Sequence, residues 1–168
     1  MQKISSPALL SIEHVLDEFD SGEPSLNVWL KKTALKNQAT GASRCFVICV
    51  GKKVIGYYSL SSGSLSRRSA PKSMQRNMPT NLPIIIMGRL AIDKNYHNQG
   101  LGKALVRDGM LRVMNASTEI GIFAILIHAL SEQAKRFYLS CGFIESPIDP
   151  MTLVMTLKTA CFIMLEPD

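Results

Sequence analysis

The chain has 168 residues, a length typical of one globular domain with a full hydrophobic core. Apolar residues make up 46% of the chain and charged residues 19%, which excludes a disordered protein. The 19 basic and 13 acidic side chains give a formal charge of +6, which suits a polyanionic partner such as a nucleic acid, a phosphorylated coenzyme or an acidic protein. Solubility alone explains the charge equally well.

No apolar run reaches the length of a membrane span, and the N-terminus lacks a signal-peptide pattern, so we expect a cytoplasmic protein without a membrane partner. Cys45 and Cys49 fall in one expected strand, about 13 Å apart by strand rise, which is too far for a disulfide. The spacing of Cys and His residues does not match a zinc site, and we expect no metal.

The N-terminal third predicts helices. Residues 1–6 are either an edge strand or a loose end, and Ser11 is a good N-cap for a short helix ending near Phe19. Pro24 suits the first turn of a second helix, whose apolar stripe continues to Asn37. The stripe consists of Leu26, Trp29, Leu30, Thr33, Ala34 and Asn37.

Two strands, 45–50 and 54–60, are expected to form a hairpin at residues 51–53. The polar segment 61–83 then reads as a long loop, and loops of this length are uncommon unless they are functional or mobile. It contains four cations and no acid, so it is either a contact for a phosphate backbone or a solvated loop. The cations are Arg67, Arg68, Lys72 and Arg76.

A buried strand at 84–92, a polar turn at 93–96 and a helix from Gly100 to about Ala116 come next. The first N–H groups of a helix lack intrahelical partners, and glycine lets a phosphate approach the backbone. This strand–turn–helix therefore predicts an anion site.

Residues 123–130 predict another strand, followed by a helix with Ser131 as its N-cap and Gly142 as its C-terminal cap. Residues 151–157 predict a further strand. The apolar tail 160–165 either extends the sheet or packs against a second subunit. Helices, a hairpin and then strand–helix–strand–helix–strand predict an α/β fold with a mixed sheet. We expect a single domain over residues 1–168, with the tail 158–168 unassigned.

The motif His97-Asn98-Gln99-Gly100-Leu101-Gly102 resembles the Gln/Arg-x-x-Gly-x-Gly/Ala signature of the GNAT acyltransferase superfamily. The resemblance implies a mixed, mostly antiparallel sheet flanked by helices on both faces, and a loop that binds the pyrophosphate of acetyl-CoA. His97 departs from the usual Gln or Arg, and we expect its neutral imidazole to serve as one hydrogen-bond partner. The implied cofactor-binding residues are Leu90, Ala91, Ile92, His97, Asn98, Gln99, Gly100, Leu101, Gly102, Lys103, Ala104 and Ser131.

A second stretch, Ser131-x-x-Ala134-x-x-x-Tyr138-x-x-x-Gly142-Phe143, also resembles GNAT proteins, in which the tyrosine is often the general acid. A phenol, with an ordinary pKa of about 10, stays protonated at neutral pH and can supply the proton for a departing thiolate. The resemblance implies that backbone N–H groups at Leu90, Ala91 or Ile92 stabilise the oxyanion. Glu119, Glu132 and His128 are the candidates for a base, and we do not expect an essential carboxylate.

The N-terminal third, from Phe19 through Gly22, Asn27 and Trp29, is similar to GNAT toxins of type II toxin–antitoxin modules. The segment from Met87 to Asp93 fits the same group. This resemblance implies acetyl transfer from acetyl-CoA to the α-amine of aminoacyl-tRNA, which blocks translation. It also implies a homodimer and a ribbon-helix-helix antitoxin that binds operator DNA.

We therefore expect an aminoacyl-tRNA N-acetyltransferase toxin. Its tRNA contacts would be Arg67, Arg68, Lys72, Arg76 and Arg89. Two alternatives stay open. One is a GNAT enzyme that acts on a small amine or a protein N-terminus. The other is a non-catalytic, antitoxin-binding subunit that represses its own operon.

Overall fold

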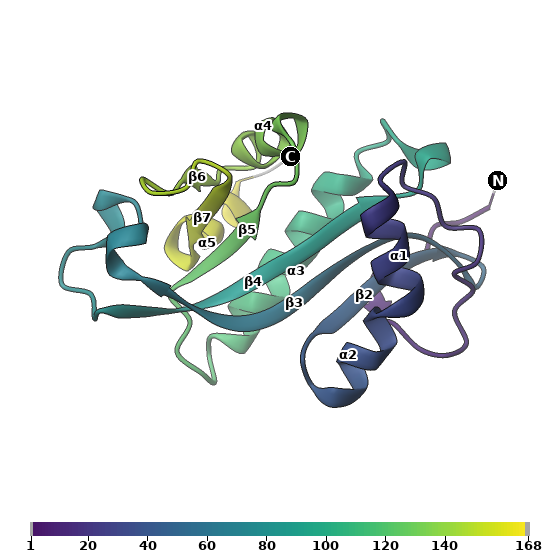
Figure 1. The fold of residues 1–168 in the computed structure, drawn as a ribbon, viewed down its shortest axis with the longest axis horizontal. Helices are drawn as coiled ribbons and strands as arrows, with labels where there is room; N and C mark the ends of the chain where they lie inside the picture. The colour runs from purple at the N-terminus through teal and green to yellow at the C-terminus, as the bar shows by residue number, and fades with distance from the viewer. Residues whose placement is uncertain (1, 167–168) are drawn as a thin grey trace. The chain divides into compact units, whose positions relative to one another are not determined.

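The structure is a computed structural model that describes residues 2–166 of the chain (Figure 1). Its strands pair in the order β1-β2-β3-β4-β5-β7-β6. They are β1 Ala8–Leu9, β2 Arg44–Val50, β3 Lys53–Ser66, β4 Asn81–Ile92, β5 Ala124–His128, β6 Ile144–Glu145 and β7 Thr152–Thr156. The β4–β5 ladder is parallel, while β1–β2, β2–β3, β5–β7 and β6–β7 are antiparallel, so the predicted mixed, mostly antiparallel sheet is confirmed. The chain divides into two compact units: Met1–Ser61 with Arg89–Asp108, and Ser62–Gly88 with Gly109–Asp168.

The first unit contains the predicted hairpin and the N-terminal helices. Strands β2 and β3 pair through Cys49↔Val54 and Val50↔Lys53, with a tight turn at Gly51, where φ is 63°. Helices α1 and α2 place Trp29, Leu30 and Ala34 in an apolar cluster with side chains of β2 and β3 (Figure 1). Thr33 separates the two helices, where one had been expected. The bounds are β1 Ala8–Leu9, α1 Pro24–Lys32, α2 Ala34–Thr40, β2 Arg44–Val50 and β3 Lys53–Ser66.

The expected helix from Ser11 to Phe19 is wrong. The backbone of Val15 pairs with the hairpin instead: its N–H donates to the carbonyl of Lys52, and its carbonyl accepts from the N–H of Val54. These bonds use the groups that a helix would need internally, so residues 11–19 form turns that still bury Phe19. Within residues 2–6, Ile4 forms an isolated β-bridge with Val50. Met1 lies outside the described residues.

The second unit is built on β4 as far as Gly88 and on β5, β6 and β7. The parallel ladder pairs Ile84, Ile85 and Ile86 with residues 124–126, and β5 continues along β7 as far as His128↔Thr152. Alternate side chains of β4, β5 and β7 form one apolar cluster, as the period of two in a strand requires. The bounds are β4 Asn81–Ile92, β5 Ala124–His128, β6 Ile144–Glu145 and β7 Thr152–Thr156.

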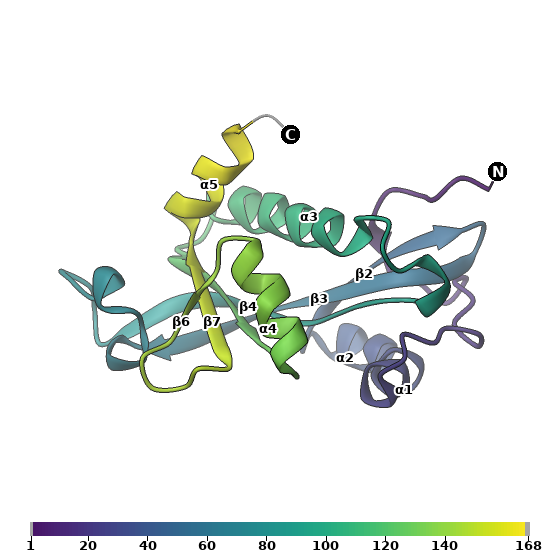
Figure 2. The same ribbon diagram turned by 90° about the horizontal axis from the view of Figure 1, so that it is seen from above.

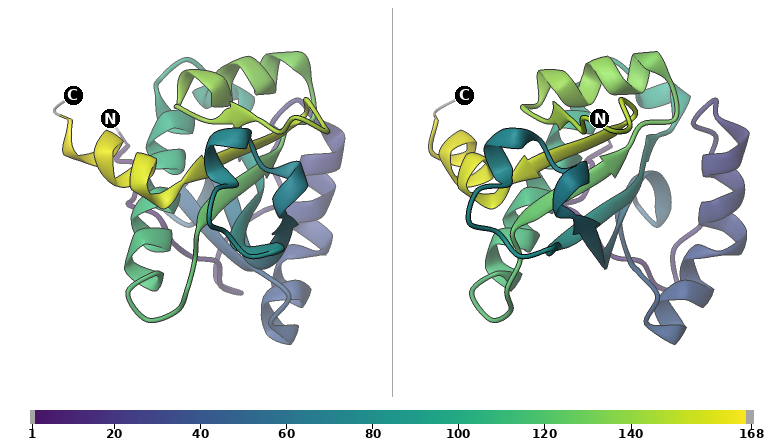
Figure 3. Two further views of the ribbon diagram at one scale, coloured as in Figure 1. Left: turned by 90° about the vertical axis from the view of Figure 1, so that its left-hand side faces the viewer. Right: turned by 60° about the vertical axis from the view of Figure 1, so that its left-hand side comes forward.

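Residues 67–80, which we call the basic segment, are shorter and more ordered than the loop expected over 61–83. Strand β3 extends to Ser66 and β4 begins at Asn81, and the connection contains two short helical turns, η1 Arg67–Ser69 and η2 Lys72–Met74. Ala70 and Met74 are buried in the same cluster as Val154 of β7, and Figure 3 shows these turns beside β7. A buried apolar side therefore fixes this segment in place.

Three further helices follow the chain. Helix α3 is Leu101–Ala116, as the sequence predicted, and α4 is Glu132–Ser140 with Ser131 as its N-cap. The tail forms a helix, α5 Leu157–Leu165, which continues from β7 (Figure 2), so of the two alternatives for the tail, extension of the sheet is wrong. Residues 167–168 of the tail lie outside the described residues. Within residues 2–166, no helix has both the length and the apolar character needed to cross a bilayer.

Candidate active site

In the first unit, the loop after β4 has the geometry of an anion site. Asn98 and Gly100 have positive φ values of 63° and 77°, so the chain makes left-handed turns immediately before α3. A Cβ placed on Gly100 would meet no atom within 4 Å, which means that the backbone there is open to a ligand. Glycine is needed at this position for its conformation, because side chains disfavour such a φ.

The start of α3 supplies the donors. The first bond of helical type at this end runs from the N–H of Ala104 to the carbonyl of Gly100, at 3.1 Å. The N–H groups of Leu101, Gly102 and Lys103 precede it and have no carbonyl one turn earlier within the helix. The positive end of a sixteen-residue helix and these N–H groups fit a pyrophosphate.

Asp93 holds the near end of this loop. Its side chain is 1% exposed and accepts from the N–H of Asn95 at 2.9 Å and from the N–H of Asp20 at 3.1 Å. Lys94 also bonds to Asp20: its N–H donates to the carbonyl of Asp20, and its ammonium lies 2.9 Å from Oδ2 of Asp20. These contacts between Asp93, Lys94 and Asp20 form a clamp that was not among the features expected from the sequence, although Asp directly after a strand and before a turn is a capping signal.

His97 lies on the same loop, and its side chain is bonded to β4. Its Nε2 is 2.7 Å from the carbonyl oxygen of Ile92. A carbonyl only accepts, so Nε2 carries the hydrogen, and in the neutral ring Nδ1 is left as an acceptor. The imidazole therefore ties the loop to the strand end, and its direct contact with a phosphate stays a prediction.

Arg89 also belongs to the first unit, where it lies over an aromatic group. Its guanidinium carbon is 4.6 Å from the centre of the Trp29 ring, and Trp29 stacks on Tyr57. The Tyr57 hydroxyl donates to the carbonyl of Leu26 at 2.6 Å, which fixes the stack against α1. Arg89 is exposed, so its guanidinium donors remain accessible to a phosphate.

In the second unit, α4 carries Tyr138 and begins at Ser131. Tyr138 is 7% exposed, with Phe137 and Phe143 in edge contact, and burial raises the pKa of its hydroxyl to about 12. It is therefore a proton donor at neutral pH. The Ser131 hydroxyl accepts from the N–H of Ala134 at 3.1 Å, so it is engaged as the N-cap that the sequence predicted.

The four cations of the basic segment differ in their contacts. Arg67 donates to the carbonyl of Met78 at 2.8 Å, and its backbone N–H donates to Thr80, so it braces the segment. Arg68, Lys72 and Arg76 are exposed. The Ser146 hydroxyl anchors the segment from the β6–β7 connection by donating to the carbonyl of Ser69 at 2.6 Å.

The structure thus groups the expected residues into two sets. The strand end, the anion loop and Arg89 belong to the first unit, while Tyr138, Ser131 and the basic segment belong to the second. The parallel ladder between β4 and β5 ends at Ile86↔Leu126, although both strands continue within the second unit. In the described part of the chain, no group of three His, Cys, Asp or Glu side chains could hold a metal ion.

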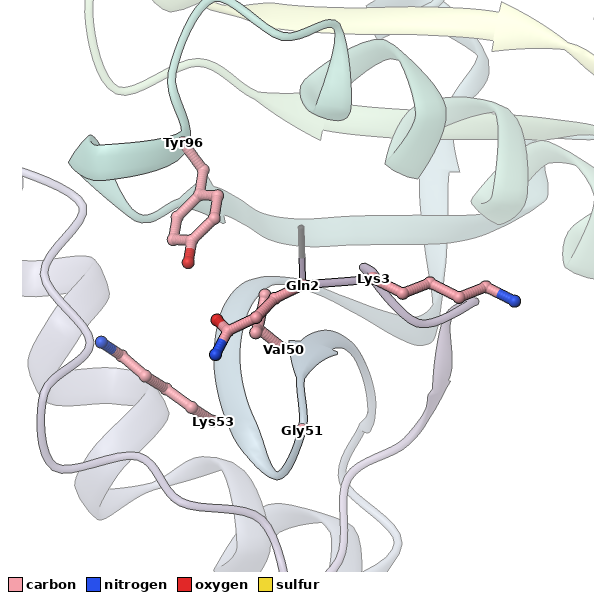
Figure 4. A pocket seen from close by; sticks show the side chains of 6 residues that line it. All are labelled: Gln2, Lys3, Val50, Gly51, Lys53 and Tyr96. Atoms are coloured by element: carbon pink, nitrogen blue, oxygen red, sulfur yellow. The ribbon is translucent and has the colours of Figure 1, made fainter.

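A separate hollow of about 400 Å³ lies beside η3, Lys94–Tyr96, in the first unit. Figure 4 shows the Tyr96 hydroxyl, the Gln2 amide and the Lys53 ammonium around it. The Lys53 ammonium lies 2.9 Å from a carboxylate oxygen of Glu18, so its charge is balanced. None of the expected site residues lines this hollow.

Comparison with known proteins gives a consistent result. The family described as "Acetyltransferase (GNAT) domain" matches residues 41–145. The chain is 43% identical over 160 residues to the tRNA-acetylating toxin of Mycobacterium tuberculosis, which covers 95% of this chain and 96% of the relative.

Among solved structures, AtaT complexed with acetyl-methionyl-tRNAfMet superposes with a TM-score of 0.89 at 30% identity, covering 96% of this chain and 99% of the other. A mutant AtaT bound to the C-terminus of the antitoxin AtaR and acetyl-CoA gives a TM-score of 0.84 at 28% identity, covering 97% and 99%. A KacTA–DNA complex gives 0.81 at 31% identity, covering 96% and 98%.

Proposed function

Because this chain belongs to the GNAT acetyltransferase family, we propose that it is a toxin that acetylates aminoacyl-tRNA. It transfers the acetyl group of acetyl-CoA to the α-amine and so blocks translation. The observation that carries the proposal is the 43% identity over 160 residues to a tRNA-acetylating toxin. Charged tRNA is used in the cytoplasm, and we place the activity there.

The acetyl-CoA pyrophosphate is assigned to the loop before α3. The N–H groups of Leu101, Gly102 and Lys103 face it, with Gly100 open beside them. Asn98 and Gln99 complete the turn, and Ala104 closes the first helical turn. We assign His97 the role of holding this loop against Ile92, since its donor nitrogen is already bonded there.

The thioester is assigned to the end of β4. We propose that the pantetheine arm lies along the end of β4 and pairs with its backbone as an added strand would. Backbone N–H groups at Leu90, Ala91 or Ile92 would then donate to the oxyanion that forms when the amine attacks. The N–H of Asp93 is already bonded to Ile55, so it is not among these donors.

Tyr138 is assigned as the general acid. The amine forms a bond to the thioester carbon, the carbon–sulfur bond breaks, and the Tyr138 hydroxyl gives its proton to the departing thiolate. Burial among Phe137 and Phe143 keeps this hydroxyl protonated until that moment.

The basic segment and Arg89 are assigned to the tRNA. Arg68, Lys72 and Arg76 are exposed on a segment whose inner side is buried, so they offer positive charge on a rigid support. Arg67 braces the segment through Met78 while its charge adds to the same field. Arg89 is held by Trp29 and offers donors to the acceptor end.

The partner assignments extend the proposal. We propose an antitoxin of the ribbon-helix-helix class, operator binding through that antitoxin, and a homodimeric toxin. Support comes from relatives: a mutant AtaT is seen with AtaR, and KacTA is seen with DNA. Helix α5 exposes Phe162 and Leu165 to 68% and 79%, an apolar surface that suits a contact between subunits.

The decisive experiment is transfer of radiolabelled acetyl from acetyl-CoA to a pool of charged tRNA by the wild type and by Tyr138→Phe. We expect label on the aminoacyl group, with the turnover of the variant reduced about 100-fold or more, since a positioned acid contributes roughly that much. Phe137→Leu, on the adjacent ring, is the packing control and should retain activity. If the wild type does not label charged tRNA but binds acetyl-CoA, a small amine or a protein N-terminus becomes the better substrate.

A further inference from the structure

The second unit contains a chain of three polar side chains to which the proposed function gives no role. It runs from Asp149, in the β6–β7 connection, through Thr152 at the start of β7 to His128 at the end of β5. The Thr152 hydroxyl donates to Oδ2 of Asp149 at 2.8 Å, and Nδ1 of His128 lies 3.0 Å from the Thr152 oxygen. Thr152 is 5% exposed, whereas Asp149 and His128 are both exposed. A buried hydroxyl therefore links a surface carboxylate to an accessible imidazole.

The direction of these bonds fixes the hydrogen on the imidazole. A threonine hydroxyl has one hydrogen, and here it is given to a carboxylate that can only accept. The Thr152 oxygen must then accept from His128, so Nδ1 carries the N–H. In the neutral ring, Nε2 is left with its lone pair, which is the form of a base.

Asp149, at the other end of this hydrogen-bonded series from His128, is held ionised. The Thr152 hydroxyl and the N–H of Met151, which donates to Oδ1 at 3.0 Å, keep the pKa of this carboxyl below its usual value. The other charged group that acts on it is Lys135 of α4, whose ammonium is paired with Glu145 at 2.8 Å. The carboxylate can thus stabilise the positive charge that His128 gains on taking a proton.

The position of His128 fits a reacting group. The parallel ladder of β4 and β5 ends at Leu126, and His128 follows two residues later on the same side of the strand. In open α/β sheets, ligands bind outside the carboxyl ends of the parallel strands, and His128 lies at that end of β5. Tyr138 lies on α4, the next element of the same unit.

We propose that His128 is the general base of the reaction, an inference that rests on the proposed function. As the α-amine nitrogen bonds to the thioester carbon, it gives up one proton to Nε2 of His128. Tyr138 gives one proton to the thiolate, so the products are the N-acetylated aminoacyl-tRNA and free thiol. Solvent then returns the proton from the imidazolium to the tyrosinate, which restores both groups.

The test measures kcat/KM for acetyl transfer to charged tRNA at neutral pH, with and without added imidazole. The variants are His128→Gln, which retains a donor for Thr152 but cannot take a proton, and His128→Ala. At neutral pH we expect a fall of about 100-fold in both. Added imidazole should restore part of the His128→Ala rate and should leave the wild-type rate unchanged. Asp149→Asn should give a smaller fall.

The matched control is His14→Ala in the first unit, where the imidazole Nδ1 accepts from the N–H of Ser11. It should leave kcat/KM unchanged, and acetyl-CoA binding by calorimetry should match the wild type in all variants. An unchanged kcat/KM in His128→Gln would overturn the inference while leaving the proposed function standing. A loss that imidazole does not rescue, together with weaker acetyl-CoA binding, would also overturn it. A wild type that never labels charged tRNA would defeat the proposed function and this inference with it.

Discussion

The three histidines of this chain show how much a single neighbour decides about a residue. The ring of His14 accepts a hydrogen from a backbone N–H, that of His97 donates to the carbonyl of Ile92, and that of His128 donates to Thr152. Among these described contacts, only the partner of His128, Thr152, is itself hydrogen-bonded to a carboxylate. The hydrogen-bond partner therefore decides the role of each imidazole: His14 stabilises a turn, His97 holds a loop against β4, and His128 is the proposed base.

Asp20 gives a prediction at this scale. The Lys94 ammonium, the N–H of Gly22 and the Asn27 amide hold its pKa at about 2, below its ordinary value of 3.8. The unfolded chain therefore binds more protons between these values, and acid removes the stabilisation as pH falls from about 4 towards 2. In thermal unfolding, Asp20→Asn should flatten the dependence of Tm on pH in this window. Asp17→Asn, an exposed neighbour, is the control, and equal slopes in all three proteins would contradict the assignment.

At the scale of elements, helix-capping signals in the sequence predicted the structure correctly where no long-range backbone pairing competed with the helix. Ser131 caps α4 and Gly142 follows its end with a φ of 107°, as the sequence predicted. The segment from Ser11 to Phe19 has an equally good helical pattern, yet Val15 is drawn into the hairpin by two backbone bonds. A short helix is marginal on its own, so backbone pairing with a strand prevails.

The cap of α4 tests whether Ser131 acts on structure, on acetyl-CoA or on both. Ser131→Ala should lower the free energy of unfolding by about 1 kcal/mol, while Ser131→Asn should retain most of it, because Asn also caps. Denaturant titration measures this. Thr156→Ala removes the corresponding cap of α5, where the hydroxyl accepts from Thr159 at 3.1 Å, and is the matched control. A raised KM for acetyl-CoA in Ser131→Ala alone would assign the hydroxyl a role in binding, and equal KM values would argue against one.

At the scale of the whole molecule, the relevant quantity is where the net charge of +6 lies. Exposed cations occur on the basic segment and also on α1 and α2, at Lys31, Lys32 and Lys36. A polyanion responds to the total charge at long range but bonds only to the cations it touches. The two contributions can therefore be separated by variants of equal charge.

We expect Arg68→Glu with Arg76→Glu to weaken tRNA use and to reduce the dependence of kcat/KM on salt by about one unit of log–log slope per lost phosphate contact. Lys31→Glu with Lys36→Glu makes the same change in net charge, from +6 to +2 by two reversals of two units each, and should have a smaller effect. Acetyl-CoA binding should be the same in both. Equal losses in the two double variants would mean that net charge, rather than the basic segment, attracts the tRNA.

The sequence alone predicted the features that depend on neighbours along the chain. These are the hairpin at Gly51, the strand–turn–helix with its anion loop, the cap at Ser131 and the α/β class. Each follows from periodicity, turn chemistry or an unsatisfied helix end, which act over a few residues. The position of Tyr138 on α4 was predictable for the same reason.

Only the tertiary structure decided the contacts between distant residues. The pairing of β5 with β7 brings His128 to Thr152, and the clamp brings Asp93 to Asp20, across 73 residues of chain. The hydroxyl of Ser146 orders the basic segment at Ser69, 77 residues away, which turned an expected loop into a support. Such contacts depend on strand register and on packing at long sequence separation, and a local pattern contains no information about either.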